Sequence, residues 1–355
     1  MEKSRKSNFE LLRIISMLLI VVYHYVIYGG ILNVGAYTIN KLTSLFVYTS
    51  GRLGVNVFIL LMGYFMINSR FKIKKVLKLM FQVFFYAVAL AVLSVYRYKA
   101  SFEQTNMSPY YTPIMATVYW FITCYVATYI FSPFLNKLIK SLGKQNCEKL
   151  IILFTAVLVI IPFFNKYKFV TNFITWFLYM YTIGAYIREY NFEFKKPKTG
   201  KRIFLSYLII AYITIIASIA LNKYFDLGLD TGYFVDLYSP LTIIGAIGIF
   251  MWFKNMDIKD NKVINFFGKT SFAVYLLHDN VMYKNILWSL DCKTQLVEQS
   301  PIYEFLGHMI ISVLGIYLVA SLIETLRVYL LEKPLFKIKI FDKYFDKLDN
   351  WMNIE

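Results

Sequence analysis

Ten runs of apolar residues divide the chain, and a short polar segment separates each run from the next. An α-helix rises about 1.5 Å per residue, so a run of about 20 residues can cross the apolar core of a bilayer. The pattern therefore predicts an all-α polytopic membrane protein with about ten transmembrane helices. The runs cover about 9–29, 43–66, 79–96, 114–133, 150–164, 171–188, 203–221, 239–253, 263–282 and 304–330.

Basic residues are concentrated in every second polar segment. Counted from the N-terminus, the two tails and the even-numbered segments hold 27 of the 38 Lys and Arg residues, and the opposite segments hold 8. Cytosolic loops of membrane proteins carry an excess of Lys and Arg, so we predict that both termini are cytosolic. The formal net charge of +17 then reflects topology and contact with membrane lipids, and we expect no nucleic-acid partner.

The composition supports the membrane class. Hydrophobic residues make up 58% of the chain and charged residues 17%, whereas soluble domains are about a quarter charged. The three cysteines form no CxxC motif or Cys/His cluster, so we expect no metal site. The first run carries Glu10 and Arg13 and lacks a small-x-small cleavage site, which favours a retained span over a signal peptide.

We interpret residues 1–355 as a single transmembrane domain that ends in a cytosolic tail at 332–355. Aromatic and leucine residues recur in this tail at helical spacing, which predicts an amphipathic helix. Such a helix either lies in the membrane interface or packs on the cytosolic ends of the spans. Abundant Lys, Ile, Asn and Tyr indicate an AT-rich bacterial genome, and hence a multi-pass protein of a bacterial cell membrane.

The first run contains Arg13 near its start and His24 near its end. At eleven residues apart, both side chains lie on one helix face, about 16 Å apart along the axis. Ionisable groups inside a span usually face the bundle interior or a water-filled cavity. The structural alternatives are that Arg13 extends to the membrane interface and that His24 is a hydrogen-bonded core residue.

The predicted topology places all three histidines toward the outer side of the membrane. His24 and His278 lie late in outward-running spans, His308 lies early in an inward-running span, and Arg52 and Asn56 belong at a similar level. A histidine at this depth suits general-base catalysis. Asn56 and the glycines around it indicate either close helix packing or a broken helix that lines a cavity.

The partner that orients His24 must come from another helix. Glu10 lies about 21 Å from His24 along the axis, so we expect it to pair with Arg13 instead. Asp279 is a candidate partner, and its structural alternative is a solvated loop residue. Trp120 lies at the end of a span, where tryptophans commonly form the interfacial belt.

Four motifs resemble those of the acyltransferase-3 family of membrane-bound acyltransferases. The first run has Arg13, ten residues and His24, within LLRIISMLLIVVYHY. The second run has GRLGVNVFILLMGYF, which is similar to the family's G-x-x-x-F-F-x-x-S-G-[FY], except that Ile59 replaces the second Phe and Met62 replaces Ser. YWFITCYVATYIFSP in the fourth run and GKTSFAVYLLH in the ninth are similar to the family's W-F-x-x-x-Y and S-x-x-x-Y-L-x-H.

The resemblance implies transfer of an acyl group, usually acetyl from acetyl-CoA, to a hydroxyl of a cell-surface polysaccharide or lipid-linked sugar. It implies that His24 is catalytic and that Arg13 and Arg52 serve donor binding or transfer. Acetyl-CoA is then a substrate, and no bound cofactor is expected. We add as possible pocket residues Asn56, Trp120, Tyr275, His278 and Asp279.

Acetyl-CoA is made in the cytosol, whereas His24 is predicted to lie toward the outside. The acyl group must therefore cross part of the membrane, and Arg13 and His24 mark the two ends of that path. His24 acts either as a general base or through a covalent acyl-histidine. The alternative function is a transporter or exporter of a small polar solute or glycan, and the sequence leaves the oligomeric state open.

Overall fold

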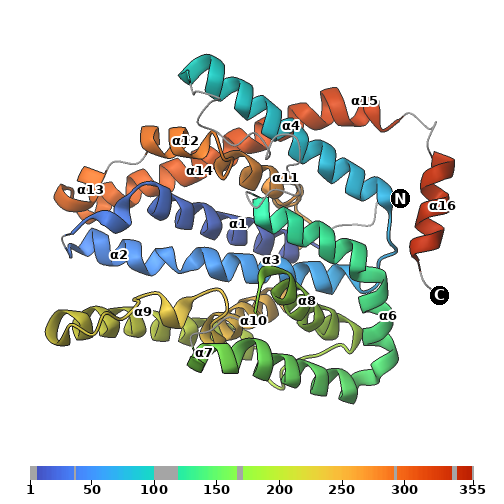
Figure 1. The fold of residues 1–355 in the computed structure, drawn as a ribbon, viewed down its shortest axis with the longest axis horizontal. Coiled ribbons are helices and arrows are strands. Elements are labelled where there is room, and N and C mark those ends of the chain that lie inside the picture. Colours follow the sequence, from blue (N-terminus) through green and yellow to red (C-terminus); the bar gives the residue numbers. More distant parts are fainter. Residues whose placement is uncertain are drawn as a thin grey trace.

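The computed structural model describes residues 6–35, 37–99, 119–165, 171–291, 294–337 and 342–353. Every regular element in these ranges is a helix, which confirms the all-helical prediction. In the middle of the molecule α1 packs against α3, with α4, α11 and α14 on one side and α8, α9 and α10 on the other (Figure 1). These helices span Ser7–Tyr28 (α1), Ser50–Met66 (α3), Ile73–Tyr98 (α4), Phe173–Glu189 (α8), Thr199–Phe225 (α9), Pro240–Lys254 (α10), Lys262–His278 (α11) and Ile302–Arg327 (α14).

Seven helical stretches in the described residues are long and apolar enough to cross a membrane. They are Ser7–Tyr28, Ile39–Met66, Ile73–Tyr98, Trp120–Phe164, Thr199–Phe225, Tyr233–Lys254 and Ile302–Leu335. One of them, Trp120–Phe164, covers two predicted spans, and α8 and α11 have only 17 residues each. The membrane-type architecture is therefore shown, whereas the count of ten spans and the side on which the termini lie stay predictions.

The helix α6 (Trp120–Thr155) corrects one predicted boundary. We expected the fourth run to end at Ser132-Pro133, but α6 continues through Pro133 and bends at Gly143, where φ is +70°. Pro133 has no N–H for the carbonyl of Tyr129, one turn earlier, but the Ser132 hydroxyl donates to that carbonyl at 2.7 Å, so the helix persists through the proline. Glycine adopts positive φ without strain, so the helix bends at Gly143, ten residues after Pro133. A π-helical turn (Ala156–Ile160) and α7 (Ile161–Asn165) extend the second arm.

The second predicted span is broken near its start. α2 spans Ile39–Tyr48 and is followed by its C-cap residue, Thr49, and α3 begins at Ser50. The helix α2 begins four residues before the predicted boundary because the Thr38 hydroxyl caps it, accepting a hydrogen bond from the backbone N–H of Lys41 at 3.2 Å. Of the two interpretations of the Asn56 region, a broken helix is therefore met only at Thr49, because Asn56 itself lies in continuous helix.

Close packing, the other interpretation of that region, holds at the contact between α3 and α8. Gly63 of α3 faces the carbonyl of Tyr181, and Gly184 of α8 faces the carbonyl of Leu60. A Cβ at either glycine would collide with these backbone atoms. The two backbones therefore approach as closely as small residues allow, which fixes α3 against α8.

Side-chain caps fix where three of the helices begin. Asn172 forms a capping box with Thr175 at the start of α8. Ser239 accepts from the backbone N–H of Leu241 and precedes Pro240, the first residue of α10. Asn261 accepts at 2.9 Å from the backbone N–H of Val263 and starts α11. Each cap satisfies an N–H that has no partner inside its helix.

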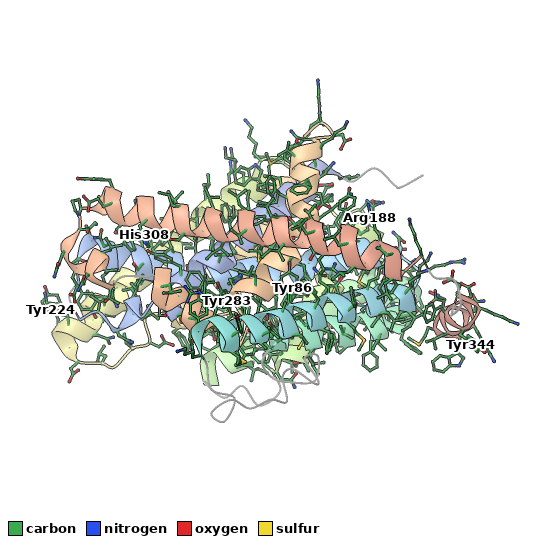
Figure 2. The ribbon with its side chains drawn as sticks, turned by 90° about the horizontal axis from the view of Figure 1, so that it is seen from above. Tyr86, Arg188, Tyr224, Tyr283, His308 and Tyr344 are labelled. Atoms are coloured by element: carbon green, nitrogen blue, oxygen red, sulfur yellow. The ribbon has the colours of Figure 1, made fainter. Side chains whose placement is uncertain are left out.

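The C-terminal tail contains the predicted helix, α16 (Asp342–Met352). It packs against the start of α4, where Asp349 accepts at 2.7 Å from the backbone N–H of Ile73, and Lys74 lies 3.1 Å from Asp342. Tyr344 points away from the helix bundle and is 72% exposed (Figure 2). The tail therefore packs on the ends of the spans and leaves an aromatic side chain uncovered.

Candidate active site

His24 lies in the last turns of α1, and its ring contacts His278 at the end of α11. The Nδ1 atom of His24 is 2.8 Å from Nε2 of His278, and Nδ1 of His278 is 2.5 Å from the carbonyl oxygen of Val274. His24 is 8% exposed and His278 is fully buried. The partner that sequence reasoning left open is thus His278.

Asp279 lies beside this pair but binds other groups. The Tyr28 hydroxyl donates to its carboxylate at 3.0 Å, and Nζ of Lys284 lies 3.6 Å from the same carboxylate. The Lys284 ammonium also sits over the Tyr28 ring, 4.5 Å from the centroid. Asp279 is 5% exposed, so it is a buried carboxylate that is paired with the Lys284 ammonium, and not a solvated loop residue.

A cavity of about 830 Å³ opens next to His24, and we call it the His24 cavity. Five of the residues chosen from the sequence line it, namely His24, Arg52, Trp120, Tyr275 and Asp279. The sequence analysis did not single out Asp236 or Lys284, which also line it. Aromatic residues form much of the remaining wall, including Tyr23, Tyr28, Phe173 and Tyr238.

The charges that line the His24 cavity are paired. Arg52 lies 3.4 Å from Asp236 and donates to the Tyr48 hydroxyl at 2.9 Å, and Lys284 lies beside Asp279. Two cations therefore face two carboxylates among the described lining residues. Trp120 stacks on Phe173 at 4.3 Å between ring centroids, so it has an intramolecular ring partner at the cavity wall. As far as the described residues line it, this cavity presents hydrogen-bonding groups and aromatic faces with no excess of charge.

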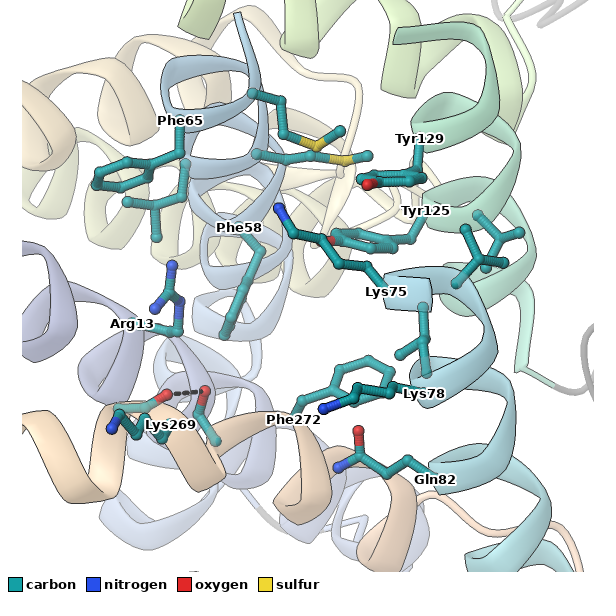
Figure 3. A pocket seen from close by; sticks show the side chains of 18 of the residues that line it. Arg13, Phe58, Phe65, Lys75, Lys78, Gln82, Tyr125, Tyr129, Lys269 and Phe272 are labelled. Carbon is teal, nitrogen blue, oxygen red and sulfur yellow. Dashed lines mark hydrogen bonds between the residues drawn. The ribbon is translucent and has the colours of Figure 1, made fainter. Parts of the chain in front are cut away.

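A second cavity, of about 540 Å³, lies at the other end of α1 and is lined by Arg13 (Figure 3). We call it the Arg13 cavity. As predicted, Arg13 pairs with Glu10, with both carboxylate oxygens at 2.8 Å. Gly268 of α11 gives the Glu10 carboxylate its space, because a Cβ at this position would collide with it.

The Arg13 cavity carries an excess of positive charge. Its lining includes five basic residues (Arg13, Lys75, Lys78, Lys269 and Arg327) and two acidic ones (Glu324 and Glu332). Lys78 lies 3.3 Å from Glu332, and Arg327 pairs with both carboxylates. Among the described residues, no carboxylate forms an ion pair with Lys75 or Lys269. Lys75 points toward the cavity in Figure 3 and Lys269 lies at its edge, so both can bind an anion.

The two cavities share a wall made of three phenylalanines. Phe58 of α3, Phe121 of α6 and Phe272 of α11 line both cavities. The rings of Phe58 and Phe121 meet edge to face at 6.3 Å between centroids. Three apolar aromatic residues therefore lie at the boundary between the two cavities.

Some residues chosen from the sequence line neither cavity. Asn56 is fully buried, donates to the carbonyl of Leu237 at 3.0 Å and accepts from Nε1 of Trp176 at 2.8 Å. It joins α3 to the segment before α10 and so has a structural role. His278 lies behind His24 in the bundle, outside both linings. The third histidine, His308 on α14 (Figure 2), is also outside them, and its Nδ1 is 2.9 Å from the Tyr25 hydroxyl.

Two kinds of signal could have revealed the residues that sequence reasoning missed. Lys75, Lys78 and Gln82 follow one another at spacings of three and four, which places them on one face of α4. Lys269 lies inside a predicted span, where a charge needs a reason. The pairing of Arg52 with Asp236 had no such signal, because 184 positions separate the two residues in the chain.

Comparison with family models gives a match over residues 6–321 to the acyltransferase-3 model, which is described as an acyltransferase domain. The chain belongs to the acyltransferase-3 family. The comparisons with curated proteins and with solved structures gave no match. Of the two departures from the family motif, Met62 lines the Arg13 cavity of this acyltransferase, and Ile59 is fully buried outside both linings.

Proposed function

We propose that this membrane acyltransferase transfers acetyl from acetyl-CoA, bound in the Arg13 cavity, to a hydroxyl of a cell-surface polysaccharide or lipid-linked sugar in the His24 cavity. One observation supports this most strongly. A cavity with excess positive charge and a charge-balanced cavity that contains a histidine share a wall of three phenylalanine side chains. We assign the Arg13 cavity to the cytosolic side and the His24 cavity to the outer side of a bacterial cell membrane.

The donor end follows from the charge of CoA, which carries phosphate groups. Lys75 and Lys269 lie at the mouth of the Arg13 cavity and are exposed, so a phosphate can reach them from solution. A lysine ammonium binds phosphate as a point charge with three donors. Arg13, which is held by Glu10, also lines this cavity and is less exposed than the two lysines.

The acyl group has to pass the wall formed by Phe58, Phe121 and Phe272. Aromatic side chains can turn about their side-chain bonds without breaking backbone hydrogen bonds, so the partition can admit a thin, apolar chain. The thioester carbonyl then meets His24 on the far side. Water and ions are disfavoured in the apolar gap, which keeps the thioester from hydrolysis before transfer.

Transfer needs one base. In the proposed step, Nε2 of neutral His24 takes the proton of the acceptor hydroxyl while the hydroxyl oxygen attacks the thioester carbonyl carbon. The new C–O bond forms as the C–S bond breaks, and the imidazolium returns its proton to the departing thiolate. The products are an acetyl ester and free CoA thiol. In the covalent variant, Nε2 of His24 attacks the thioester carbonyl carbon and the C–S bond breaks to release CoA thiolate. The acceptor hydroxyl then attacks the acetyl-imidazolium, the C–N bond breaks, and the hydroxyl proton passes to the thiolate.

The acceptor end suits a sugar. Paired carboxylates and cations offer donors and acceptors to hydroxyl groups, and Arg52–Asp236 and Asp279–Lys284 form two such pairs beside His24. The aromatic rings in the wall give a sugar ring an apolar face to lie on. This balance favours an uncharged sugar unit at the reacting position.

The test is transfer of label by purified protein in nanodiscs. Acetyl-CoA labelled in the acetyl group is added with surface glycans and lipid-linked sugars extracted from cells that lack the gene. We expect label in an alkali-labile ester on the glycan fraction, together with release of CoA thiol. Surface glycans from cells with and without the gene should differ by the same ester in mass spectrometry. Absence of the labelled ester in nanodiscs, together with less surface glycan on cells that lack the gene, would support the transporter function instead.

A further inference from the structure

We infer that His278 is a positioning residue that holds His24 in the tautomer with hydrogen on Nδ1, so that Nε2 of His24 is the basic atom facing the His24 cavity. The catalytic consequence rests on the proposed function, but the tautomer itself does not. The inference is carried by three hydrogen-bonded groups in a row, which are the carbonyl of Val274, the His278 ring and the His24 ring.

The first link fixes the hydrogen on His278. Its Nδ1 lies 2.5 Å from the carbonyl oxygen of Val274, one turn earlier on α11. A backbone carbonyl can only accept a hydrogen bond, so Nδ1 of His278 must carry the hydrogen. The neutral imidazole then has a bare Nε2, which is an acceptor.

The second contact determines which nitrogen of His24 carries the hydrogen. Nε2 of His278 is 2.8 Å from Nδ1 of His24, and two bare nitrogens at this distance would repel each other. Nδ1 of His24 must therefore donate. A proton on His278 would reverse the link, but the ring is fully buried, and the nearby carboxylate of Asp279 already accepts from Tyr28 and faces Lys284. A buried unpaired charge is strongly disfavoured.

The third step concerns the free end of the His24 ring. No hydrogen bond to Nε2 of His24 is present within the described residues, and His24 lines the cavity whereas His278 does not. A neutral histidine in water favours the tautomer with hydrogen on Nε2. In that tautomer Nε2 could not accept a proton from the acceptor hydroxyl. The contact with His278 thus selects the less common tautomer, as the orienting carboxylate does in a Ser-His-Asp triad. The carbonyl of His278 accepts from Nε1 of Trp288 at 3.2 Å, which holds the end of α11 in place.

The experiment reads the tautomer directly. The chain has three histidines, so protein labelled with ¹⁵N-histidine in nanodiscs gives at most six ring-nitrogen signals. His24→Gln and His308→Gln assign them by loss. In wild type we expect a protonated Nδ1 and an unprotonated Nε2 for His24. A His24 signal set with hydrogen on Nε2, or a charged ring, would overturn the inference whatever the activity.

Two variants of His278 test whether the tautomer of His24 affects acyl transfer. In His278→Gln the amide oxygen can accept from His24 in place of Nε2, so we expect the tautomer and most of the activity to be kept. In His278→Leu no acceptor is left, so His24 should move toward hydrogen on Nε2, with acyl transfer falling about 10²–10⁴-fold and acetyl-CoA binding unchanged. Equal activity of His278→Leu and His278→Gln at matched membrane levels would contradict the positioning role.

The two claims can fail separately. If wild type has the expected tautomer while His24→Gln still transfers acetyl, the inference about the ring pair stands and the proposed role of His24 is wrong. If His278→Leu does not accumulate, the wild-type spectrum still decides the tautomer. Absence of labelled-acetyl transfer by wild-type protein would contradict the proposed function without bearing on the spectrum.

Discussion

The two cavities lie at opposite ends of the same helix and share a wall, yet their charges are arranged differently. In the His24 cavity each cation lies beside a carboxylate, Arg52 with Asp236 and Lys284 with Asp279. In the Arg13 cavity the basic residues outnumber the acidic ones by five to two. A charge-balanced cavity suits a neutral sugar, and a basic one suits a phosphorylated donor.

The difference also indicates where the chemistry occurs. Lys75 and Lys269 are exposed at the mouth of their cavity, so water solvates them when no donor is bound. His24 is 8% exposed, so a reaction there proceeds with little competing water. If the two cavities have different roles, substitution of a residue that lines only one of them should leave binding in the other unchanged, and the largest effect is expected at His24.

His24→Gln should abolish most of the transfer. Glutamine keeps hydrogen bonding but cannot take a proton at working pH, so activity should fall about 10²–10⁴-fold. The affinity for acetyl-CoA should stay at the wild-type value, because the donor binds in the other cavity. The measurement is surface O-acetyl content at matched membrane levels, with acetyl-CoA binding to the purified protein.

His308→Gln is the matched control, since it makes the same substitution at a histidine that lines neither cavity. We expect a small effect, limited to the lost contact with Tyr25. Near-normal acetylation by His24→Gln would remove the base from the proposal and favour the transporter function. A trapped acetyl group on His24 in wild type would instead assign the covalent route.

Lys75→Gln combined with Lys269→Gln should weaken the donor end. Two exposed ionic contacts to phosphate together contribute roughly tenfold in affinity. We expect KM for acetyl-CoA to rise about tenfold with kcat little changed, and the difference from wild type to shrink at high salt. Lys74→Gln is the control, because Lys74 pairs with Asp342 outside the cavity. An unchanged KM at low salt would show that the phosphates bind elsewhere.

Arg52→Ala should affect the acceptor. The structure places Arg52 in the His24 cavity, far from the lysines, so acetyl-CoA affinity should be unaffected while KM for the glycan rises about fivefold. Arg52→Lys should recover part of the loss, because lysine keeps the charge beside Asp236 but lacks the guanidinium fork. Weaker acetyl-CoA binding by Arg52→Ala would instead support the donor role that the family resemblance implies.

Interactions within one helix were predictable from the sequence. Glu10 pairs with Arg13, and Glu324 with Arg327, as expected from a spacing of three residues. The shared face of Arg13 and His24 followed from helix periodicity, and each residue lines a cavity. The helical class followed from the length of the apolar runs.

Interactions between helices were not predictable. His24 and His278 are 254 positions apart, and no local pattern indicates that their rings meet. The phenylalanine wall draws on α3, α6 and α11, each of which contains many other aromatic residues. The boundary at Ser132-Pro133 was wrong because proline is a stop signal for helices in water, whereas α6 continues through it and bends at Gly143.

Phe58→Ala should widen the partition between the cavities. Truncation of a core phenylalanine to alanine costs about 3–5 kcal/mol of stability. Phe58 is only half-buried, so Phe58→Ala should cost less than this. We expect acetyl transfer within about threefold of wild type and a gain of transfer from butyryl-CoA relative to acetyl-CoA. Phe65→Ala, which lines only the Arg13 cavity, should leave this ratio unchanged. An unchanged ratio in Phe58→Ala would mean that the acyl group does not pass this wall.

The smallest effect is expected from cysteines at the two ends of α9, which should leave activity unchanged and report which cavity faces the cytosol. Lys198 immediately precedes α9, and Lys223 lies in its last turn. The segment after that end reaches the His24 cavity, where Arg52 donates to the carbonyl of Gly232 at 3.4 Å. Lys41 is unsuitable as an outer site, because it is buried and donates to the carbonyls of Ile31 and Leu32.

With the three native cysteines replaced by alanine, Lys223→Cys should react with an impermeant thiol reagent in intact cells, and Lys198→Cys should react only after lysis. The reason is the concentration of basic residues on the Lys198 side, where the positive-inside rule places the cytosol. The two sites lie on one helix, so a single orientation explains either pattern. The reverse labelling would put the Arg13 cavity outside, away from the cytosolic supply of acetyl-CoA. The basic cavity would then need an extracellular anion as its ligand, and the proposed direction of transfer would be wrong.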